Sequence, residues 1–291
     1  MSGLDVSDLL ARCTFAPPGT QVDCAVSGGP DSMALMVLAV EAGLDVTAWH
    51  VDHGLRPESA SEGELVARTA VSVSAAVMRV EAPVEHGPNL EARAREARIV
   101  VLPAGVLTGH TADDQAETVI MNILRGAGIQ GAAGIGDPDR RPLLALRRAE
   151  TTAVCAVAGI TPAHDTMNDD PRFFRNRVRH EIVPLMAEVS GRDPVPLLAR
   201  HADRAREAVG LLSTLVDGID ATDVSVLSGL SDDLARLALR TWLTDCSGGR
   251  PPDLASVDRV LEVARGSRRA AEVVGGHRVE RSAGRLTHLP D

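Results

Sequence analysis

A short polar stretch between two apolar runs carries the strongest chemical signal in this sequence. Residues 22–35 read VDCAVSGGPDSMAL. The first apolar run predicts a buried strand, and the second, which has helical spacing, predicts a helix from about Ser32. A helix that follows a glycine-rich turn presents free backbone N–H groups and the positive end of its dipole, and both favour a phosphate. We therefore expect this turn to bind phosphate.

Each residue type in the turn has a use in such a site. Glycine lets the backbone approach a ligand, serine adds hydroxyl donors, and aspartate can hold a metal ion that bridges phosphates. No lysine follows, so the turn differs from the G-x-x-x-x-G-K-[ST] loop of the common NTPases. The alternative is an ordinary tight turn in which Ser32 caps the helix. The expected nucleotide contacts are Ser27, Gly28, Gly29, Pro30, Asp31 and Ser32.

A second polar stretch, GHTADDQAET at residues 109–118, combines a histidine with three carboxylates. Asp113 and Glu117 are four residues apart and share one face of the predicted helix. Helix capping explains Asp114 but only part of the rest. Carboxylate oxygens beside a phosphate loop suit Mg²⁺, which binds through one or two carboxylates plus substrate phosphates. The expected metal ligands are Asp31, Asp113 and Asp114, and His110 and Glu117 join them as expected catalytic residues.

A third stretch, NDDPRFFRNRVRH at residues 168–180, is rich in arginine. Arg172, Arg175 and Arg179 have the spacing of one helix face, which is usually a solvated face. Two of the three phenylalanines of the chain lie in the same stretch, which favours a surface for phosphates and bases. We expect these arginines to bind a nucleic acid.

Two weaker signals come from loops. Residues 50–56 read HVDHGLR, in which His53 could orient a nucleotide and Arg56 could meet a phosphate. In isolation, we favour the simpler interpretation, a polar loop after a strand with a Gly–Pro turn. Residues 124–128 read LRGAG, which predicts a mobile basic loop over the site, with Arg125 as an expected RNA contact.

Composition limits the class of protein. The chain has 291 residues, which favours two domains, and a formal net charge of −10, which argues against a general nucleic-acid coat protein. Its four cysteines form no C-x-x-C pair and indicate reduced thiols. No signal peptide and no apolar run of about 18 residues is evident, so we expect no membrane partner and a cytoplasmic location.

Strands and helices alternate along the first half of the sequence. This order predicts an α/β fold with a parallel sheet covered by helices on both faces, and ligands in such sheets bind at the carboxyl ends of the strands. The expected strands are 22–26, 45–51, 76–80 and 105–108, and the expected helices are 6–12, 32–42, 61–73, 89–98 and 111–125. Later helices at 197–216, 234–243 and 254–264 precede an expected β-hairpin at 271–286.

Taken together, the motifs resemble the tRNA(Ile)-lysidine synthetases, a family of the PP-loop ATP pyrophosphatase superfamily. SGGPDS at 27–32 is typical of the superfamily, whereas VDHGLR at 51–56 and RNRVRH at 175–180 are more specific. The resemblance covers about residues 22–184. The other matching stretches are NLEARAREAR at 89–98, GHTADDQAETV at 109–119, LRGAG at 124–128 and RPLL at 141–144.

The resemblance implies a domain plan. Residues 1–188 would form a PP-loop ATP-binding catalytic domain, and residues 189–291 a smaller, mainly helical linker or substrate-binding domain. The large C-terminal tRNA-binding domain of long family members has no counterpart in this sequence.

The resemblance also implies a reaction. ATP adenylates O2 of the wobble cytidine in tRNA(Ile) with a CAU anticodon, and the ε-amine of L-lysine then attacks C2 and displaces AMP. The cofactors would be ATP and Mg²⁺. The base that deprotonates the amine stays open between His53, His110 and Glu117, and the oligomeric state, a homodimer included, also stays open.

Two alternatives share parts of this pattern. A PP-loop thiolase that modifies cytidine would share the ATP loop and an RNA substrate, but such enzymes usually need catalytic or cluster-binding cysteines, and no cysteine lies near His110 or Arg175 in the sequence. A non-catalytic ATP-binding switch would share the fold, but it would have little use for the carboxylate-rich helix or the arginine face.

Overall fold

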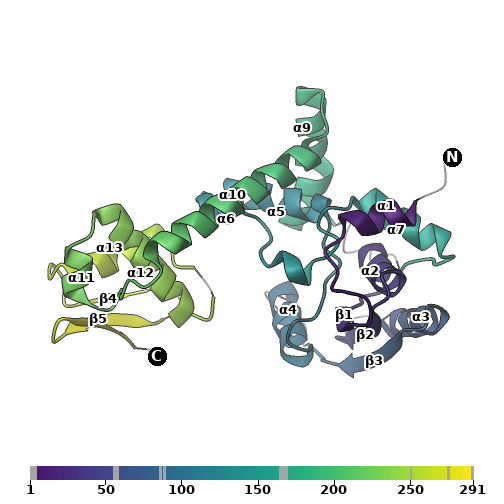
Figure 1. Cartoon of the computed structure of the whole chain (residues 1–291), viewed down its shortest axis with the longest axis horizontal. Coiled ribbons are helices and arrows are strands. Elements are labelled where there is room, and N and C mark those ends of the chain that lie inside the picture. Colours follow the sequence, from purple (N-terminus) through teal and green to yellow (C-terminus); the bar gives the residue numbers. More distant parts are fainter. Residues whose placement is uncertain are drawn as a thin grey trace. The chain divides into compact units, whose positions relative to one another are not determined.

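The computed structural model describes residues 5–54, 59–84, 87, 90–163, 170–249, 251–273 and 276–289. The chain divides into two compact units, one up to Ala205 and one from Arg206, and the division falls inside a long helix, α10 (Pro194–Val216) (Figure 1). Arg56, Asn89 and the pair Asn168–Asp169, which belong to the sequence motifs, lie outside the described residues. No helix in the described ranges is long and apolar enough to cross a membrane.

The first unit contains a parallel sheet of three strands, which confirms the predicted fold class. They are β1 (Gln21–Ala25), β2 (Asp45–Asp52) and β3 (Ala76–Glu81), paired in that order with Cys24 opposite Ala48 and Ala48 opposite Val77. The prediction of a fourth strand at 105–108 is confirmed only at Leu107, which runs beside β1 in one parallel bridge to Cys24. Gly105, with a φ of 83°, turns the chain just before it.

Helix α2 (Pro30–Glu41) forms the centre of the first core. Residues 33–39 of α2 are all buried, and Met33, Leu35, Met36 and Leu38 are fully inaccessible. A helix that is apolar on all sides must be covered on all sides, and α2 packs on β1, β2 and α7 (Arg148–Val157). The helix begins two residues before the predicted start, because proline at the first helical position has no N–H that needs a partner.

The described part of the first unit contains six further elements up to residue 140. They are α1 (Val6–Arg12), α3 (Ser59–Ser72), α4 (Leu90–Val101), α5 (Ala112–Leu124), α6 (Ile129–Ala132) and the 3₁₀ turn Pro138–Arg140. Helix α3 packs on β2 and β3 (Figure 1). Arg12 of α1 bonds through Nη1 to Glu150 Oε2 of α7 at 3.2 Å, which ties the first helix to the seventh.

The arginine-rich stretch forms an irregular helix. Helix α8 (Phe174–Arg177) continues into a π-helical turn, Val178–Ile182, and then into α9 (Val183–Ser190). Pro184 explains the widened turn, since it cannot donate to the carbonyl four residues earlier and its ring crowds that carbonyl. The π turn widens the helix at Val178–Ile182, and Arg172 lies before α8, so this segment is not one regular helix.

The second unit has its own core. Helices α11 (Val224–Ser228), α12 (Asp232–Cys246) and α13 (Leu254–Ala264) pack with an antiparallel sheet of β4 (Ala270–Glu272), β5 (Arg278–Ser282) and β6 (Arg285–Leu289). The predicted hairpin is present as β5–β6, with Ala283 and Gly284 at φ of 49° and 77°. Two positive φ values in a two-residue turn match the right-handed twist of the strands.

Candidate active site

The glycine-rich turn lies between β1 and α2, at the carboxyl edge of the sheet. Gly28 has a φ of 95°, and Gly29 is the N-cap of α2 without a side-chain cap bond. The hydroxyl of Ser32 accepts from the backbone N–H of Ser27 at 3.1 Å and donates to the carbonyl of Gly29 at 2.9 Å. Ser32 therefore closes the loop on itself rather than capping the helix.

Gly109 brings the second polar stretch against this loop. A Cβ atom at Gly109 would lie 2.4 Å from the carbonyl oxygen of Asp31 and 3.0 Å from the backbone nitrogen of Ser32. Only glycine permits such an approach of two backbones. This contact places His110 and the start of α5 beside the start of α2, although they are about 80 residues apart in the sequence.

We expect Gly109→Ala to damage the site through this backbone contact. The new methyl group must displace the start of α2, so the free energy of unfolding should fall by about 1–3 kcal/mol and ATP affinity should fall with it. Gly136→Ala is the matched control, because a Cβ there meets no atom within 4 Å. Denaturant unfolding and ATP binding measure both variants, and a Gly109→Ala protein that equals the control would disprove the contact.

Arg148, at the start of α7, joins three carboxylates. Its guanidinium lies 3.5 Å from Asp31 Oδ2 through Nε, 2.8 Å from Asp114 Oδ1 through Nη2, and 3.0 Å from Glu117 Oε1 through Nη1. Thr151, one turn further along α7, donates its hydroxyl to Asp31. Arg148 thus holds α2, α5 and α7 together at one point.

Glu117 is the most enclosed member of this group. Its side chain is 2% exposed, and each of its oxygens accepts two N–H groups. The donors are Arg148 Nη1 at 3.0 Å, Arg175 Nε at 2.8 Å, Arg179 Nε at 2.7 Å and Arg179 Nη2 at 3.1 Å. We call Asp31, Asp114, Glu117, Arg148, Arg175 and Arg179 the carboxylate–arginine cluster.

Asp114 caps α5 with one carboxylate oxygen and contacts two arginines with the other. Its Oδ2 accepts from the backbone N–H and the hydroxyl of Thr111 at 2.8 and 2.9 Å, which completes the predicted capping box of α5. Its Oδ1 accepts from Arg148 and from Arg175 Nη2, the latter at 3.1 Å. Helix capping and membership of the cluster therefore do not exclude each other.

The pKa values of the two aspartates move in opposite directions. Burial raises the pKa of Asp31, and the nearby charge of Asp114 raises it further, against the bonds from Thr151 and Arg148. Burial also raises the pKa of Asp114, but the charges of Arg148 and Arg175 outweigh it and leave that pKa below its ordinary value. Asp114 thus stays ionised, whereas Asp31 holds a proton more readily than an ordinary aspartate.

Asp113 does not join Asp31 and Asp114. Its carboxylate accepts from Arg147 at 3.1 and 3.2 Å and from the backbone N–H of Arg148 at 2.8 Å. Arg147 also bonds to Asp193. Among the described residues, no three His, Cys, Asp or Glu side chains are arranged to hold a metal by themselves. Asp113 of α5 thus contacts the start of α7 through Arg147, whereas Asp31 and Asp114 both contact the guanidinium of Arg148.

The three arginines do not share the one face that their spacing predicted. Their expected contact with a nucleic acid stays a prediction. Arg172 precedes α8, is 87% exposed and bonds to Asp170, the nearest acid in the chain. Arg175 and Arg179 instead turn inward to Asp114 and Glu117. The reason is electrostatic, because buried carboxylates on α5 attract any guanidinium that the irregular helix brings near them.

Three histidines lie around the site, each held by one nitrogen. His53 Nδ1 is 2.9 Å from the carbonyl oxygen of Ala82, and His110 Nδ1 is 2.8 Å from the hydroxyl of Thr108. His50 is 3% exposed, and its Nδ1 lies 2.9 Å from the carbonyl oxygen of Val26, directly before the loop. His110 directly follows Gly109, whose backbone packs on that of Asp31, so His110 lies beside the start of α2.

Arg148 and Thr151 were missed by sequence reasoning. One signal was available in the sequence, the pair Arg147–Arg148 shortly after the RPLL match. Basic residues at the start of a helix interact unfavourably with the helix dipole, so a pair of them there indicates another role.

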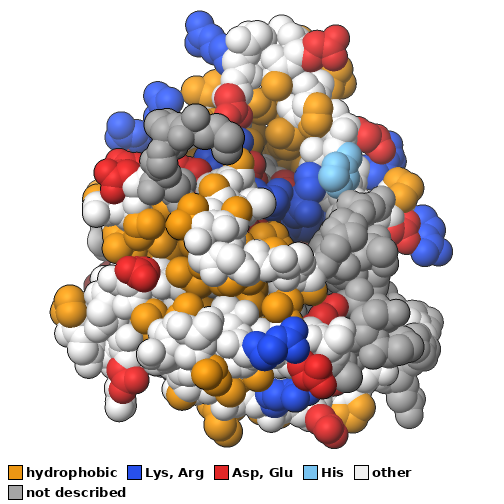
Figure 2. Space-filling model, turned by 90° about the vertical axis from the view of Figure 1, so that its right-hand side faces the viewer, with side chains coloured by type: hydrophobic (Ala, Val, Ile, Leu, Met, Phe, Trp, Pro, Cys, Tyr) orange, Lys and Arg blue, Asp and Glu red, His pale blue; other side chains and the backbone are white. Residues whose placement is uncertain are grey.

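Arg125, which was expected to bind RNA, lies at the C-cap of α5 with its guanidinium over the ring of Phe174. In the space-filling view, arginine side chains lie in a hollow of the molecule (Figure 2).

Comparison with known proteins agrees with this geometry. Residues 6–186 match a family described as PP-loop domain, and residues 223–287 match one described as TilS substrate binding domain. A tRNA(Ile)-lysidine synthase of Nocardia farcinica is 40% identical over 275 residues, which are 88% of this chain and 85% of that protein. The chain belongs to the tRNA(Ile)-lysidine synthase family.

Further relatives in the family are similarly close. The tRNA(Ile)-lysidine synthase of Mycobacterium leprae is 37% identical and that of Mycobacterium tuberculosis 38%, with 87% and 83% of this chain covered and 84% and 81% of theirs. A solved structure, the U34-tRNA thiolase NcsA from Methanococcus maripaludis with its [4Fe-4S] cluster, has a TM-score of 0.55 at 15% identity. It covers 69% of this chain and 76% of its own, and it shares the fold.

The four cysteines of this chain lack the lowered pKa that is typical of reactive thiols. All four are free thiols, and burial raises the pKa of Cys24 to about 12 and that of Cys155 to about 11. Thiols with raised pKa values are poor nucleophiles and poor metal ligands. The thiolase alternative is therefore not favoured.

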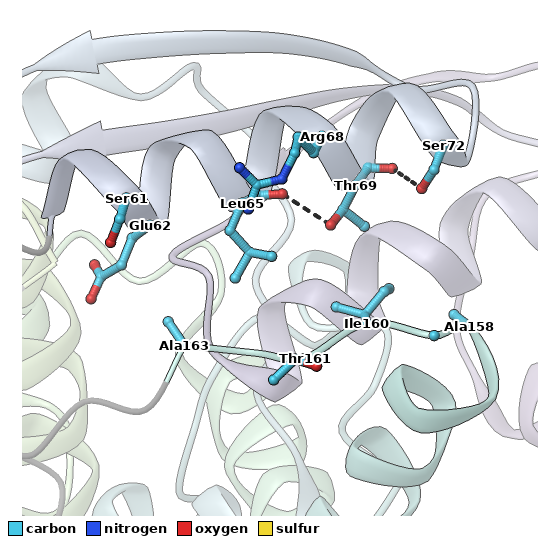
Figure 3. A pocket seen from close by; sticks show the side chains of 11 residues that line it. Ser61, Glu62, Leu65, Arg68, Thr69, Ser72, Ala158, Ile160, Thr161 and Ala163 are labelled. Carbon is cyan, nitrogen blue, oxygen red and sulfur yellow. Dashed lines mark hydrogen bonds between the residues drawn. The ribbon is translucent and has the colours of Figure 1, made fainter.

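A pocket of about 670 Å³ borders the phosphate loop on the side of α3. Helix α3 forms one wall, and residues 158–163 after α7 form the other (Figure 3). The backbone N–H of Ala163 donates to the carbonyl of Gly28 at 2.9 Å, and a Cβ at Gly28 would lie 3.6 Å from Cβ of both Ala163 and Glu62. The second wall thus supports the loop directly.

Proposed function

We propose that this protein ligates L-lysine to C2 of the wobble cytidine in tRNA(Ile) with a CAU anticodon. ATP first adenylates O2 of the base and releases pyrophosphate, and the ε-amine of lysine then attacks C2 and releases AMP. The observation that carries the proposal is the carboxylate–arginine cluster beside the phosphate loop, in a chain that matches lysidine synthases over most of its length.

The loop residues would hold the pyrophosphate part of ATP. Gly28 and Gly29 open the backbone, and the start of α2 supplies N–H groups and a positive dipole end. Catalysis of nucleotidyl transfer consists mostly of positioning and charge stabilisation. The loop therefore needs no lysine of its own if a cation accompanies the substrate.

The residues present fit Mg²⁺ in their donor chemistry. Asp31 Oδ2 and Asp114 Oδ1 approach the same guanidinium, so two carboxylates already converge on one cation beside the loop. Such a pair plus substrate phosphates is the usual environment of Mg²⁺. When bound, the ion would neutralise charge that develops on the pyrophosphate. Asp31 and Asp114 would hold it, and Asp113 would keep the start of α7 in place.

We assign the base of the second step to His110. At pH 7 only roughly one lysine ε-amine in 10³ is neutral, so a nearby base must take its proton. Glu117 already accepts four N–H groups, two on each oxygen. His53 is bound to the carbonyl oxygen of Ala82, just after β3, whereas His110 follows Gly109, which packs on the backbone of Asp31 in the cluster.

The domain plan follows the same proposal. Residues 1–188 would carry ATP binding and catalysis, and residues 189–291 would contribute to substrate binding in the cytoplasm. The matched segments at 6–186 and 223–287 fall within these two parts.

Of the three arginines at 172, 175 and 179, Arg172 is the one whose side chain is open to an RNA phosphate. It is 87% exposed, and its exposed pair with Asp170 contributes little to stability. We expect Arg172→Ala to flatten the plot of log K for tRNA binding against log[salt] by about 0.7–0.9, with an unchanged melting temperature. Arg175→Ala and Arg179→Ala should lower the melting temperature.

Arg68→Ala serves as the control for this measurement, since Arg68 is also exposed and paired, with Glu64 on α3. Its salt dependence should equal that of the wild-type protein. An unchanged slope for Arg172→Ala would show that the tRNA phosphates lie elsewhere.

The function is tested by product formation. The wild-type protein, ATP, Mg²⁺ and tRNA(Ile) with a CAU anticodon should release pyrophosphate, and added lysine should yield AMP and lysidine in equal amounts. A tRNA with uridine at the wobble position is the matched control and should give no product. Lysine-independent incorporation of sulfur would favour the thiolase, and ATP binding without any pyrophosphate release would favour the switch.

A further inference from the structure

An aromatic side chain lies exposed next to the carboxylate–arginine cluster. Phe174 is the first residue of α8, is 38% exposed, and is one of only three phenylalanines in a chain without tyrosine. A large aromatic side chain dominates core packing where it is buried, so a chain this poor in aromatics gives up core stability by leaving one in solvent. Its exposure therefore points to contact with something outside the chain.

The guanidinium of Arg125 covers one face of this ring. Its Cζ lies 5.6 Å from the ring centroid, which is within the range of a cation–π contact. In the described part of the chain, Arg125 has no carboxylate partner, in contrast to Arg148, Arg175 and Arg179. Its positive charge is therefore not neutralised and stays available to an anion.

The position of Phe174 is fixed by its neighbours in the sequence. Arg175 bonds to Glu117 at 2.8 Å and to Asp114 at 3.1 Å, and buried Asn176 donates to the carbonyl of Asp170 at 2.9 Å. The ring is thus attached to a rigid segment that contacts the cluster directly. The end of α5 adds Ile123 and Leu124, which are 52% and 57% exposed.

We propose that Phe174, with Arg125 on one face, is a stacking platform for an unpaired base of the tRNA anticodon loop. Arg125 occupies one face of the ring, and a base would stack on the other while the adjacent phosphate meets the guanidinium. Bases splayed out of an RNA loop are usually recognised by aromatic stacking together with arginine. The proposal rests on the proposed function, since it names a contact for that RNA substrate.

The first experiment measures binding of a set of anticodon stem-loops, each of which carries a fluorescent base analogue at a different unpaired position of the loop. Phe174→Leu keeps apolar bulk but removes the π face, so it should weaken binding about five- to tenfold and abolish the quenching that stacking causes. Phe174→Tyr should restore both. The KM values for ATP and lysine and the melting temperature should stay unchanged.

Two further variants sharpen the result. Arg125→Gln should weaken binding and flatten its salt dependence by about 0.7, the value for one contact to a single strand. Val189→Ala is the matched control, because Val189 on α9 is also apolar and is 79% exposed. It should bind the stem-loop like the wild-type protein.

The outcomes separate this inference from the proposed function. Lysidine formation by the wild-type protein together with unchanged stem-loop affinity and quenching in Phe174→Leu would overturn the platform and leave the function standing. Loss of stem-loop binding in Phe174→Leu, rescued by Phe174→Tyr, would support the platform even if the wild-type protein formed no lysidine.

Discussion

Glu117→Gln is expected to lower the free energy of unfolding by about 3–5 kcal/mol, the range for removal of one partner from a buried ion pair. The glutamine keeps the volume of Glu117 but removes the charge that three guanidiniums share. Its amide N–H₂ group would also point a donor at arginines that can only donate. Urea denaturation of the apo protein measures the effect.

Glu181→Gln provides the control for this change. Glu181 forms an ion pair with Arg177, and both side chains are about half exposed. Loss of this pair should lower the free energy of unfolding by less than about 1 kcal/mol. Equal effects of the two substitutions would contradict the view that the cluster is a buried electrostatic core. A double change of Glu117 and Arg148 should cost less than the two single changes added together, because the residues are directly bonded.

Asp31→Asn should reduce pyrophosphate release at least about 100-fold while the protein stays folded, because under the proposed function the change removes a carboxylate that would hold Mg²⁺. Its packing volume is kept, and the hydroxyl of Thr151 retains an acceptor. Burial raises the pKa of Asp31, so the asparagine also removes a desolvation penalty, and stability at neutral pH should not suffer greatly.

The two aspartates of α5 should then differ. Asp114→Asn is expected to lose activity as Asp31→Asn does, and it should also lose stability because it caps the helix. Asp113→Asn should keep most of its activity, since its carboxylate serves Arg147. Pyrophosphate release measured over a range of Mg²⁺ concentrations decides the assignment. Full activity of Asp31→Asn and Asp114→Asn would place the metal elsewhere, and an inactive, well-folded Asp113→Asn would contradict the separation seen here.

Local sequence patterns determined the phosphate loop, the helix caps and the apolar helices of this protein. The loop after β1, the capping box of α5 and the apolar α2 each depend on residues within a few positions, and physical chemistry acts on them in the same way in any fold. The prediction of an α/β fold with a phosphate site at the sheet edge followed from such patterns, and the structure confirms that fold.

Tertiary structure decided which charges meet. The sequence spacing predicted that Arg175 and Arg179 share one outward helix face with Arg172, but buried Asp114 and Glu117 attract both inward, and only the folded chain brings α5 and α8 together. The position of Arg148 was also decided by tertiary structure. Its partners Glu117 and Asp31 lie about 30 and 117 residues away in the sequence. Periodicity reports which side of a helix is apolar, whereas the energy of a buried ion depends on partners that only the three-dimensional packing supplies.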